Sequence, residues 1–274
     1  MTISAADVNK LRSMTGAGMM DCKKALMEAN GDFDKAIDEL RKKGQKVAAN
    51  RGDREAKEGF IIAKTTNDNK RGVVVLVNCE TDFVAKNEEF GKVASTIADI
   101  AIDKNPKTVD ELKALSFDGK ITIADKIIEQ VGKIGEKIDL AKYEVIEAAK
   151  VVAYNHPGNR LATIVGFSKE ANEEVSKNVA MQIAAMAPVA LDRGDVDPKI
   201  LEREIEIAKE QLRNEGKPED KIEMIAKGKI EKFYKEFTLL NQEFIKDSKK
   251  TVAQYLKDND KELTVTGFKR VALG

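Results

Sequence analysis

The sequence has few of the residues on which enzyme active sites and metal sites depend. Its 274 residues include one histidine, two cysteines and no tryptophan. A Ser-His-Asp or Cys-His arrangement would have to use His156, which precedes a Pro-Gly pair typical of a turn. Two cysteines and one histidine also fall short of a four-ligand zinc pattern, and no phosphate-binding glycine motif is present. We therefore expect no catalytic residue, no metal site and no cofactor.

Sparse cysteine and the lack of long apolar runs indicate where the protein works. Cys22 and Cys79 are far apart in the sequence, and such low usage is typical of a reducing compartment. No run of about 18 uncharged apolar residues occurs, so no membrane-spanning helix is expected. The first residues resemble neither a secretory signal nor a transit peptide. We expect a cytoplasmic protein with no membrane partner.

Neither sign of charge is in excess, because 47 lysines and arginines balance 47 aspartates and glutamates. A nucleic-acid-binding protein normally carries a basic excess, since neutralising phosphates supplies much of its affinity. The balance argues against direct nucleic-acid binding, although a local basic face is compatible with it. The 42% hydrophobic and 34% charged residues suit a folded, helix-rich protein with two or three modest domains.

Hydrophobic periodicity predicts three short helices near the N-terminus. Gly16 and Gly18 separate the first two helices, and Gly44 is expected to end the third. We expect a compact three-helix domain over residues 1–45, followed by a polar, partly helical linker over residues 46–58.

The remainder of the chain repeats one pattern in residues 59–138 and 139–274, which are predicted to be two subdomains of a core. In each, two β-rich runs surround a turn signature, and a helix follows. A shift of 86 positions places Ile97 on Ile183, which indicates a weak internal duplication. An antiparallel helical hairpin, or coiled coil, is expected at about 198–237. The predicted fold class is α+β.

Two pairs of neighbouring residues are unusual. Met19 and Met20 follow a glycine-rich loop, and adjacent helix positions do not share a face. At least one is therefore expected to be exposed, where a flexible thioether suits a binding surface; alternatively, both bend into a small core. For Asp82 and Phe83, the local pattern alone favours a helix-capping aspartate and a buried phenylalanine.

Three motifs carry a resemblance to a known family. The run TGAGMMDCKKAL, which starts at Thr15, resembles the first signature of the bacterial translation elongation factor Ts family. The run NCETDFV at residues 78–84 resembles the second signature, and HPGNR at 156–160 is similar to a third stretch. The resemblance extends to KIGE at 133–136, the helical hairpin and the closing VTGF run, so it covers nearly the whole chain.

The resemblance implies a guanine-nucleotide exchange factor for elongation factor Tu, with a ubiquitin-associated-like N-terminal domain. The Asp-Phe pair of the family's second signature acts as a wedge that disrupts the partner's Mg²⁺ and phosphate site and promotes GDP release. The residues implied in that role here are Thr81, Asp82, Phe83 and Val84. Supporting core contacts are implied for Ile134, Gly135 and His156. Contacts from the N-terminal domain are implied for Arg12, Met19, Met20 and Lys23.

Alternatives stay open beside this interpretation. The helical hairpin could form a homodimer, dock on the partner or simply extend. A ubiquitin-type adaptor that works through its first three helices is a function of a different class, but it leaves Asp82, Phe83 and the duplicated core unexplained. An organellar form of the same factor and an RNA-binding protein are two further alternatives.

Overall fold

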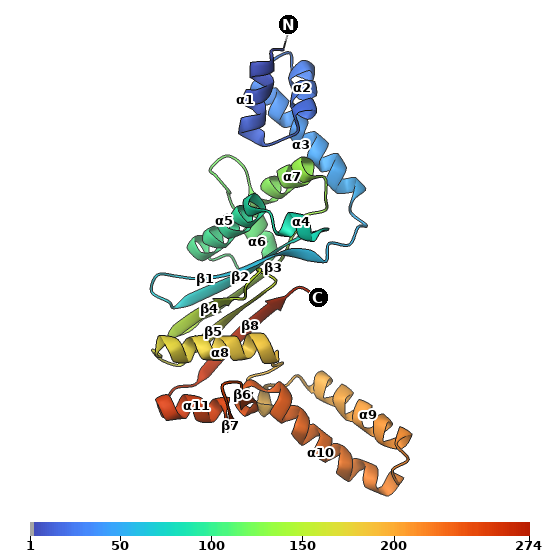
Figure 1. Ribbon diagram of the computed structural model, residues 1–274, viewed down its shortest axis with the longest axis vertical. Coiled ribbons are helices and arrows are strands. Elements are labelled where there is room, and N and C mark those ends of the chain that lie inside the picture. Colours follow the sequence, from blue (N-terminus) through green and yellow to red (C-terminus); the bar gives the residue numbers. More distant parts are fainter. Residues whose placement is uncertain (1–2) are drawn as a thin grey trace.

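The computed structural model describes residues 3–274, and it combines helices with small antiparallel sheets in an α+β fold (Figure 1). The N-terminal helices are α1 (Ala5–Thr15), α2 (Met19–Glu28) and α3 (Phe33–Asn50). Ser4 begins α1 through a reciprocal capping box with Asp7, and Gly16 ends it at a positive φ of 68°. The three helices enclose a small apolar core that includes Leu11, Cys22 and Leu26.

The predicted end of the third helix at Gly44 is wrong, because α3 continues to Asn50. Gly44 lies against α7 (Ile123–Ile134), where a Cβ atom would be 2.7 Å from the carbonyl oxygen of Ile128. The glycine therefore permits close approach of two helices and does not terminate one of them. Beyond this crossing, Val47 and Ala48 pack against the core of the first sheet.

The first sheet has the antiparallel order β1-β2-β3 and is covered by helices on its outer face. Its strands are β1 (Glu58–Thr65), β2 (Arg71–Cys79) and β3 (Asp139–Glu147). The covering helices are α5 (Glu88–Lys104), α6 (Val109–Ala114) and α7. Side chains of β2 alternate, since Val73 and Val75 contact the helices while Val74 and Leu76 point to the opposite face. Strand β3 was not anticipated from the sequence.

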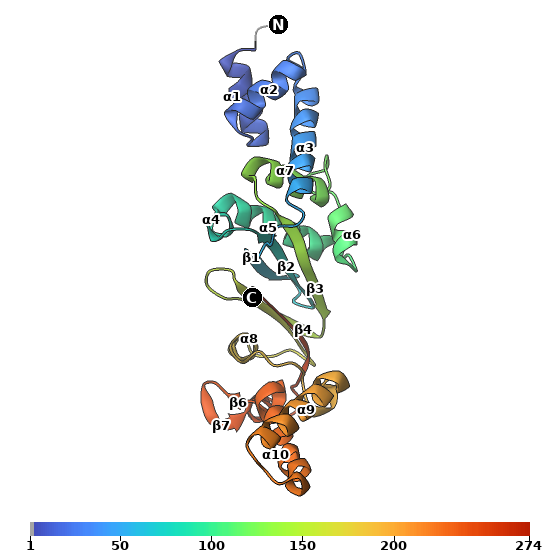
Figure 2. The same cartoon turned by 90° about the vertical axis from the view of Figure 1, so that its right-hand side faces the viewer.

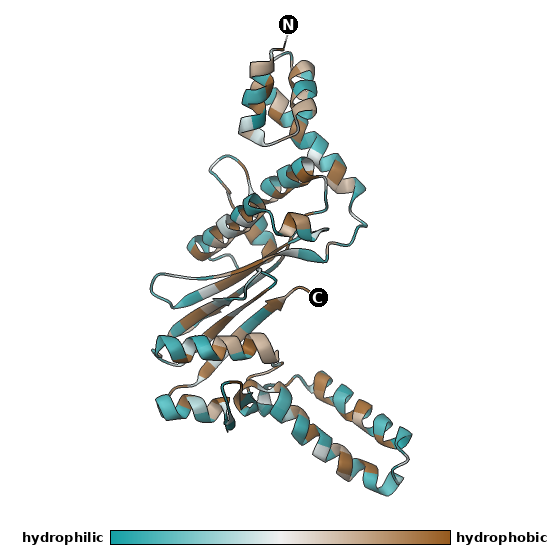
Figure 3. Cartoon of the chain, viewed as in Figure 1, coloured by the Kyte–Doolittle hydropathy of each residue, from teal (hydrophilic) through white to brown (hydrophobic). Residues whose placement is uncertain are grey.

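The second sheet has the equivalent order β4-β5-β8. Its strands are β4 (Lys150–Asn155), β5 (Leu161–Phe167) and β8 (Val265–Ala272), and its outer face is covered by α8 (Glu173–Met186) and α11 (Val252–Asn259). The inner faces of both sheets share one apolar core, to which Ile61, Leu76 and Ile164 contribute. Figure 1 shows the resulting layers, with α5 and α8 on opposite sides of the paired sheets, and Figure 3 shows that hydrophobic residues concentrate in the strands.

The two hairpin turns make reciprocal contacts with the opposite sheet. The carbonyl oxygen of Asn69 accepts a hydrogen bond from the Val151 N–H at 2.5 Å, and that of Asn159 accepts one from the Ile61 N–H at 2.7 Å. The two acceptors, Asn69 and Asn159, are 90 positions apart in the sequence, and so are the two donors, Ile61 and Val151. The two contacts are therefore equivalent in the two halves. The turn of one half is therefore fixed by the first strand of the other.

A helical hairpin and the three N-terminal helices lie at opposite ends of the molecule (Figure 2). The hairpin consists of α9 (Pro198–Asn214) and α10 (Glu219–Phe237), which enclose Ala208, Leu212, Ile222 and Ala226. Short elements connect it to the second sheet: the 3₁₀ helices Arg193–Asp195 and Leu239–Asn241, and the strands β6 (Glu243–Phe244) and β7 (Asp247–Thr251). Within residues 3–274, the helices are too short or too polar for any of them to cross a membrane.

Candidate functional site

The Thr-Asp-Phe-Val motif forms a single helical turn, α4 (Asp82–Ala85), directly after β2. Thr81 is the N-cap, because its hydroxyl accepts a hydrogen bond from the Val84 N–H at 3.4 Å. The local interpretation of Asp82 as the cap is therefore wrong. Asp82 instead pairs with Lys86 at 2.6 Å, and this hydrogen bond lowers the pKa of the Asp82 carboxyl below its usual value. Asp82 is consequently ionised at neutral pH.

Phe83 points into solvent, so the interpretation of it as a buried staple is also wrong. Its exposed fraction is 83%, the highest of any large hydrophobic residue in the part of the chain that the structure describes. The neighbouring Val84 and Ala85 are half-buried and pack against the core of the first sheet. The turn is thus anchored on one side and presents an aromatic ring on the other. Exposed aromatic rings on a supported backbone are typical anchors of protein interfaces.

The segment that ends α7 lies beside this turn. Ile134 lines a shallow surface pocket together with Phe83, Val84 and Phe90. Gly135 ends the helix at a positive φ of 80°, and its N–H donates to the carbonyl oxygen of Val131 at 2.8 Å. The structure therefore brings together Ile134, Gly135 and Phe83, which are far apart in the sequence.

His156 lies in the exposed turn between β4 and β5. Its Nδ1 atom is 3.0 Å from the hydroxyl of Tyr154. In the same turn, Arg160 forms an ion pair with Glu58, which raises the pKa of the Arg160 guanidinium, with a smaller contribution from the negative charge of Asp82. Glu58 is paired with Cys79 across β1 and β2, three residues before α4 begins, so the ion pair of Arg160 brings the HPGNR turn close to α4.

The four residues implied in the N-terminal contact are all exposed, one on α1 and three on α2. They are Arg12, Met19, Met20 and Lys23. Met19 and Met20 are 52% and 72% exposed, which confirms that at least one of them faces solvent. Met14 and Met27 are exposed as well, whereas Cys22 on α2 is buried. Sequence reasoning did not identify Met27, because a methionine on a helix is equally compatible with a core position.

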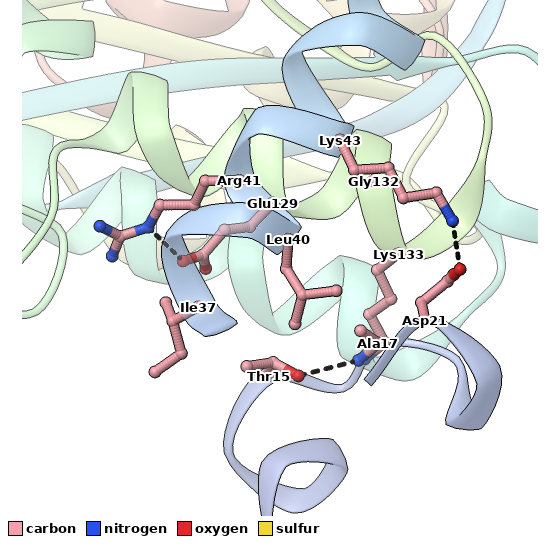
Figure 4. Close-up of a pocket in the computed structure, with 10 residues that line it drawn as sticks. All are labelled: Thr15, Ala17, Asp21, Ile37, Leu40, Arg41, Lys43, Glu129, Gly132 and Lys133. Carbon is pink, nitrogen blue, oxygen red and sulfur yellow. Dashed lines mark hydrogen bonds and ion pairs between the residues drawn. The ribbon is translucent and has the colours of Figure 1, made fainter. Parts of the chain in front are cut away.

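Lys133 lies between the glycine-rich loop that follows α1 and the pocket that Phe83 lines. Its Nζ atom pairs with Glu89 at 2.6 Å, beside the pocket that Phe83 lines. The same lysine lies against Gly16, where an added Cβ would be 2.7 Å from Nζ. Figure 4 shows Lys133 in a second pocket with Thr15 and Ala17 of the glycine-rich loop. The loop and α4 are therefore neighbours on one surface.

The cysteine nearest the motif is buried and has a neutral thiol. Cys79 is fully buried below the motif and donates to the carbonyl oxygen of Thr81 at 3.2 Å. Burial is the main cause that raises the pKa of the Cys79 thiol to about 12, which leaves it a poor nucleophile. Within residues 3–274, no cluster of three or more histidine, cysteine, aspartate or glutamate side chains is arranged to hold a metal ion.

Comparison with known proteins identifies the family. A family model described as elongation factor TS matches residues 80–274. The elongation factor Ts of Flavobacterium psychrophilum is 58% identical over 275 residues, which cover 100% of this chain and 99% of the relative. The protein of the same name from Christiangramia forsetii is 53% identical and covers 99% of each chain. That of Chloroherpeton thalassium is 50% identical over 96% of this chain and 94% of the relative. The chain therefore belongs to the elongation factor Ts family.

Proposed function

We propose that this member of the elongation factor Ts family promotes release of GDP from elongation factor Tu by pressing α4 against the Mg²⁺ and phosphate site of that GTPase. The proposal rests on one observation above all: the ring of Phe83 is 83% exposed on a helical turn whose other side is anchored in the core. The residues proposed to act at the metal site are Thr81, Asp82, Phe83 and Val84.

A small displacement is enough for this mechanism. Mg²⁺ requires near-octahedral oxygen ligands at about 2.0–2.1 Å, so movement of its ligands by a fraction of that distance weakens the ion and the nucleotide together. Insertion of the Phe83 ring between structural elements of the partner supplies the displacement. The ionised carboxylate of Asp82 accepts hydrogen bonds near the vacated site.

The exchange reaction follows from linkage and needs no covalent step. The factor binds the nucleotide-free partner more tightly than the nucleotide-bound one, and by reciprocity an incoming nucleotide weakens the binding of the factor. The chain therefore acts by binding its partner, elongation factor Tu. The proposal places it in the cytoplasm and includes no direct contact with nucleic acid or membrane.

Further contacts extend the interface on both sides of α4. Ile134, Gly135 and His156 support it from the core. Arg12, Met19, Met20 and Lys23 hold the nucleotide-binding domain of the partner. The position of Lys133 between the glycine-rich loop and Glu89 supports one continuous interface.

The proposal also divides the chain into functional parts. The ubiquitin-associated-like domain is proposed at residues 1–45. The linker expected at 46–58 is shorter, because α3 continues to Asn50 and β1 begins at Glu58. The boundary expected between core subdomains 59–138 and 139–274 moves past β3, because β3 pairs with β2 in the first sheet. The hairpin of α9 and α10 exposes Ile200 and Met224, which leaves it available for a homodimer.

Phe83→Ala tests the wedge. We expect the variant to fold as the wild type does, because the ring is largely exposed, and to lose most of the stimulation of fluorescent GDP release from elongation factor Tu. Ile245→Ala is a matched control, since Ile245 is a 43% exposed apolar residue between β6 and β7, in the other half of the chain. Wild-type exchange by Phe83→Ala would remove Phe83 from the mechanism.

A second measurement addresses the adaptor alternative. Binding of ubiquitin, measured by titration, should be negligible compared with binding of nucleotide-free elongation factor Tu. A tight complex with ubiquitin and none with the GTPase would favour the adaptor.

A further inference from the structure

Two carboxylates that the proposed function does not use hold the loop in front of α4. Glu136 follows the end of α7, and its Oε2 atom accepts hydrogen bonds from the backbone N–H groups of Glu80 and Thr81, both at 3.1 Å. Its Oε1 atom accepts a third bond from the Thr81 hydroxyl at 2.7 Å. One carboxylate therefore fixes two consecutive peptide groups and the cap residue of α4. Hydrogen bonds to an ionised acceptor are among the stronger ones in proteins.

Glu80 makes the reciprocal contact. Its Oε1 atom accepts a hydrogen bond from the Lys137 N–H at 2.6 Å, so the loops at 80–81 and 136–137 bind each other in both directions. Arg51, at the end of α3, donates to both oxygens of Glu80 at 2.8 and 2.9 Å. The Glu80 side chain is only 16% exposed. Three segments that are distant in the sequence thus converge where α4 begins.

The short helix needs this support. A single turn of four residues closes too few hydrogen bonds to be stable alone. None of its residues is fully buried, so packing fixes it only in part. The Thr81 hydroxyl donates to Glu136 and accepts from the Val84 N–H, which carries the constraint from the carboxylate into the turn.

We propose that Glu136 is a positioning residue for Phe83: it orients the start of α4 so that the aromatic ring is presented outward for its partner. This inference rests on the proposed role of Phe83. Glu136 acts through the backbone and the cap residue, and it does not need to touch the partner.

The chemistry of the contact explains why a carboxylate is required. A glutamine in place of Glu136 keeps one oxygen for the two backbone N–H groups but turns an amide NH₂ toward the Thr81 hydroxyl. The hydroxyl must then accept from this amide as well as from the Val84 N–H, and its own proton loses its acceptor. An alanine removes all three bonds.

The test compares exchange rates of single and double variants of the full chain, with fluorescent GDP release from elongation factor Tu as the readout. We expect Glu136→Ala to lose about tenfold or more in stimulated release at subsaturating factor, and Glu136→Gln to lie between it and the wild type. Glu147→Ala is the control, because Glu147 joins β3 to Arg71 at 3.7 Å and to Asn105 at 3.3 Å, away from α4.

A double-mutant cycle separates positioning from a general structural role. The cycle is read as the dissociation constant for nucleotide-free elongation factor Tu, which stays measurable when exchange is lost. If Glu136 acts through Phe83, Glu136→Ala weakens binding by the wild type about tenfold but binding by Phe83→Ala within about twofold. Thr81→Val provides the same cycle with the two hydrogen bonds of the hydroxyl removed, the one to Glu136 and the one from the Val84 N–H, in case Glu136→Ala melts below the assay temperature. Circular dichroism melts identify that case.

The outcomes are distinguishable. Two outcomes overturn the positioning role: full additivity in the Phe83→Ala background, or wild-type exchange by both Glu136→Ala and Thr81→Val. Either outcome leaves the wedge intact as long as Phe83→Ala itself is defective. Wild-type exchange by Phe83→Ala overturns both proposals together.

Discussion

Burial of a phenylalanine side chain typically stabilises a protein by about 1.5–3 kcal/mol relative to leaving it exposed. Phe83 forgoes most of that contribution, although the core of the first sheet is close enough to bury parts of Val84 and Ala85. Single exposed apolar residues are common, and exposure alone does not mark a site. The distinguishing features of Phe83 are its anchored backbone, the adjacent ionised Asp82 and the neighbouring end of α7.

Cys79, directly before the motif, gives a pH-dependent prediction. Burial raises the pKa of its thiol from 9.0 to about 12, so above pH 9 the unfolded chain releases a proton that the folded chain retains. Stability is therefore fully present below pH 9 and falls as the pH rises toward 12. Between pH 8 and pH 10, urea unfolding should show the wild type losing about 1.4 kcal/mol more than Cys79→Ala. Identical pH dependence of the two proteins would contradict the burial of a neutral thiol.

At the residue scale, the sequence predicts the exposure of one side chain pair and not that of Phe83. Exposure of Met19 or Met20 follows from helix geometry, and both are exposed. Exposure of Phe83 does not follow from the local pattern, which favours a core staple. The roles of Glu80 and Glu136 depend on contacts between residues 55 to 57 positions apart, and the sequence alone contains no pattern that pairs them.

Among the helices, α3 and α7 approach each other closely at two glycines. A Cβ atom on Gly132 would be 3.0 Å from the Cα atom of Gly44, so a glycine on each helix allows the approach. The ion pair of Arg41 with Glu129, at 3.5 Å, spans the same two helices (Figure 4). This contact holds the N-terminal helices at a fixed position beside the first sheet.

Substitution of Gly44 tests the crossing. Alanine is the better helix former, but at this position its Cβ would be 2.7 Å from a backbone oxygen, so we expect Gly44→Ala to lower the free energy of unfolding by about 1–3 kcal/mol. Gly228 is the control in α10, where no described atom lies within 4 Å of an added Cβ, and Gly228→Ala should raise the free energy of unfolding by about 0.5–1 kcal/mol. Urea unfolding measures both. Equal stabilisation by the two substitutions would show that the crossing is loose.

Helix starts and stops were predictable wherever a local signal sets them. The predicted start of the helical hairpin at about 198 is confirmed, because Asp197 caps α9 and Pro198 begins it. The end of α3 was mispredicted because Gly44 serves a tertiary contact with α7. The sequence does not distinguish a glycine that permits close helix packing from a glycine that ends a helix. Strand β3 was missed because its buried residues Leu140 and Tyr143 are three positions apart, where a register shift interrupts the alternation.

In the whole molecule, the two sheets are joined by hydrogen bonds from both hairpin turns. The turn carbonyls of Asn69 and Asn159 bind the first strand of the opposite sheet, and a shared apolar core lies between them. The HPGNR turn and α4 therefore lie on two halves that contact each other directly, and the proposed wedge would be supported by both. The paired sheets could be anticipated from the duplicated pattern, but their reciprocal contacts could not.

Release of fluorescent GDP from elongation factor Tu tests the central claim most directly. The full chain, added in increasing concentration to the GDP-loaded GTPase with excess unlabelled nucleotide, should accelerate the loss of fluorescence until the rate saturates. Phe83→Ala, at the same concentrations, should leave the rate close to the spontaneous one. Release at the spontaneous rate at every concentration of the wild-type chain would contradict the account.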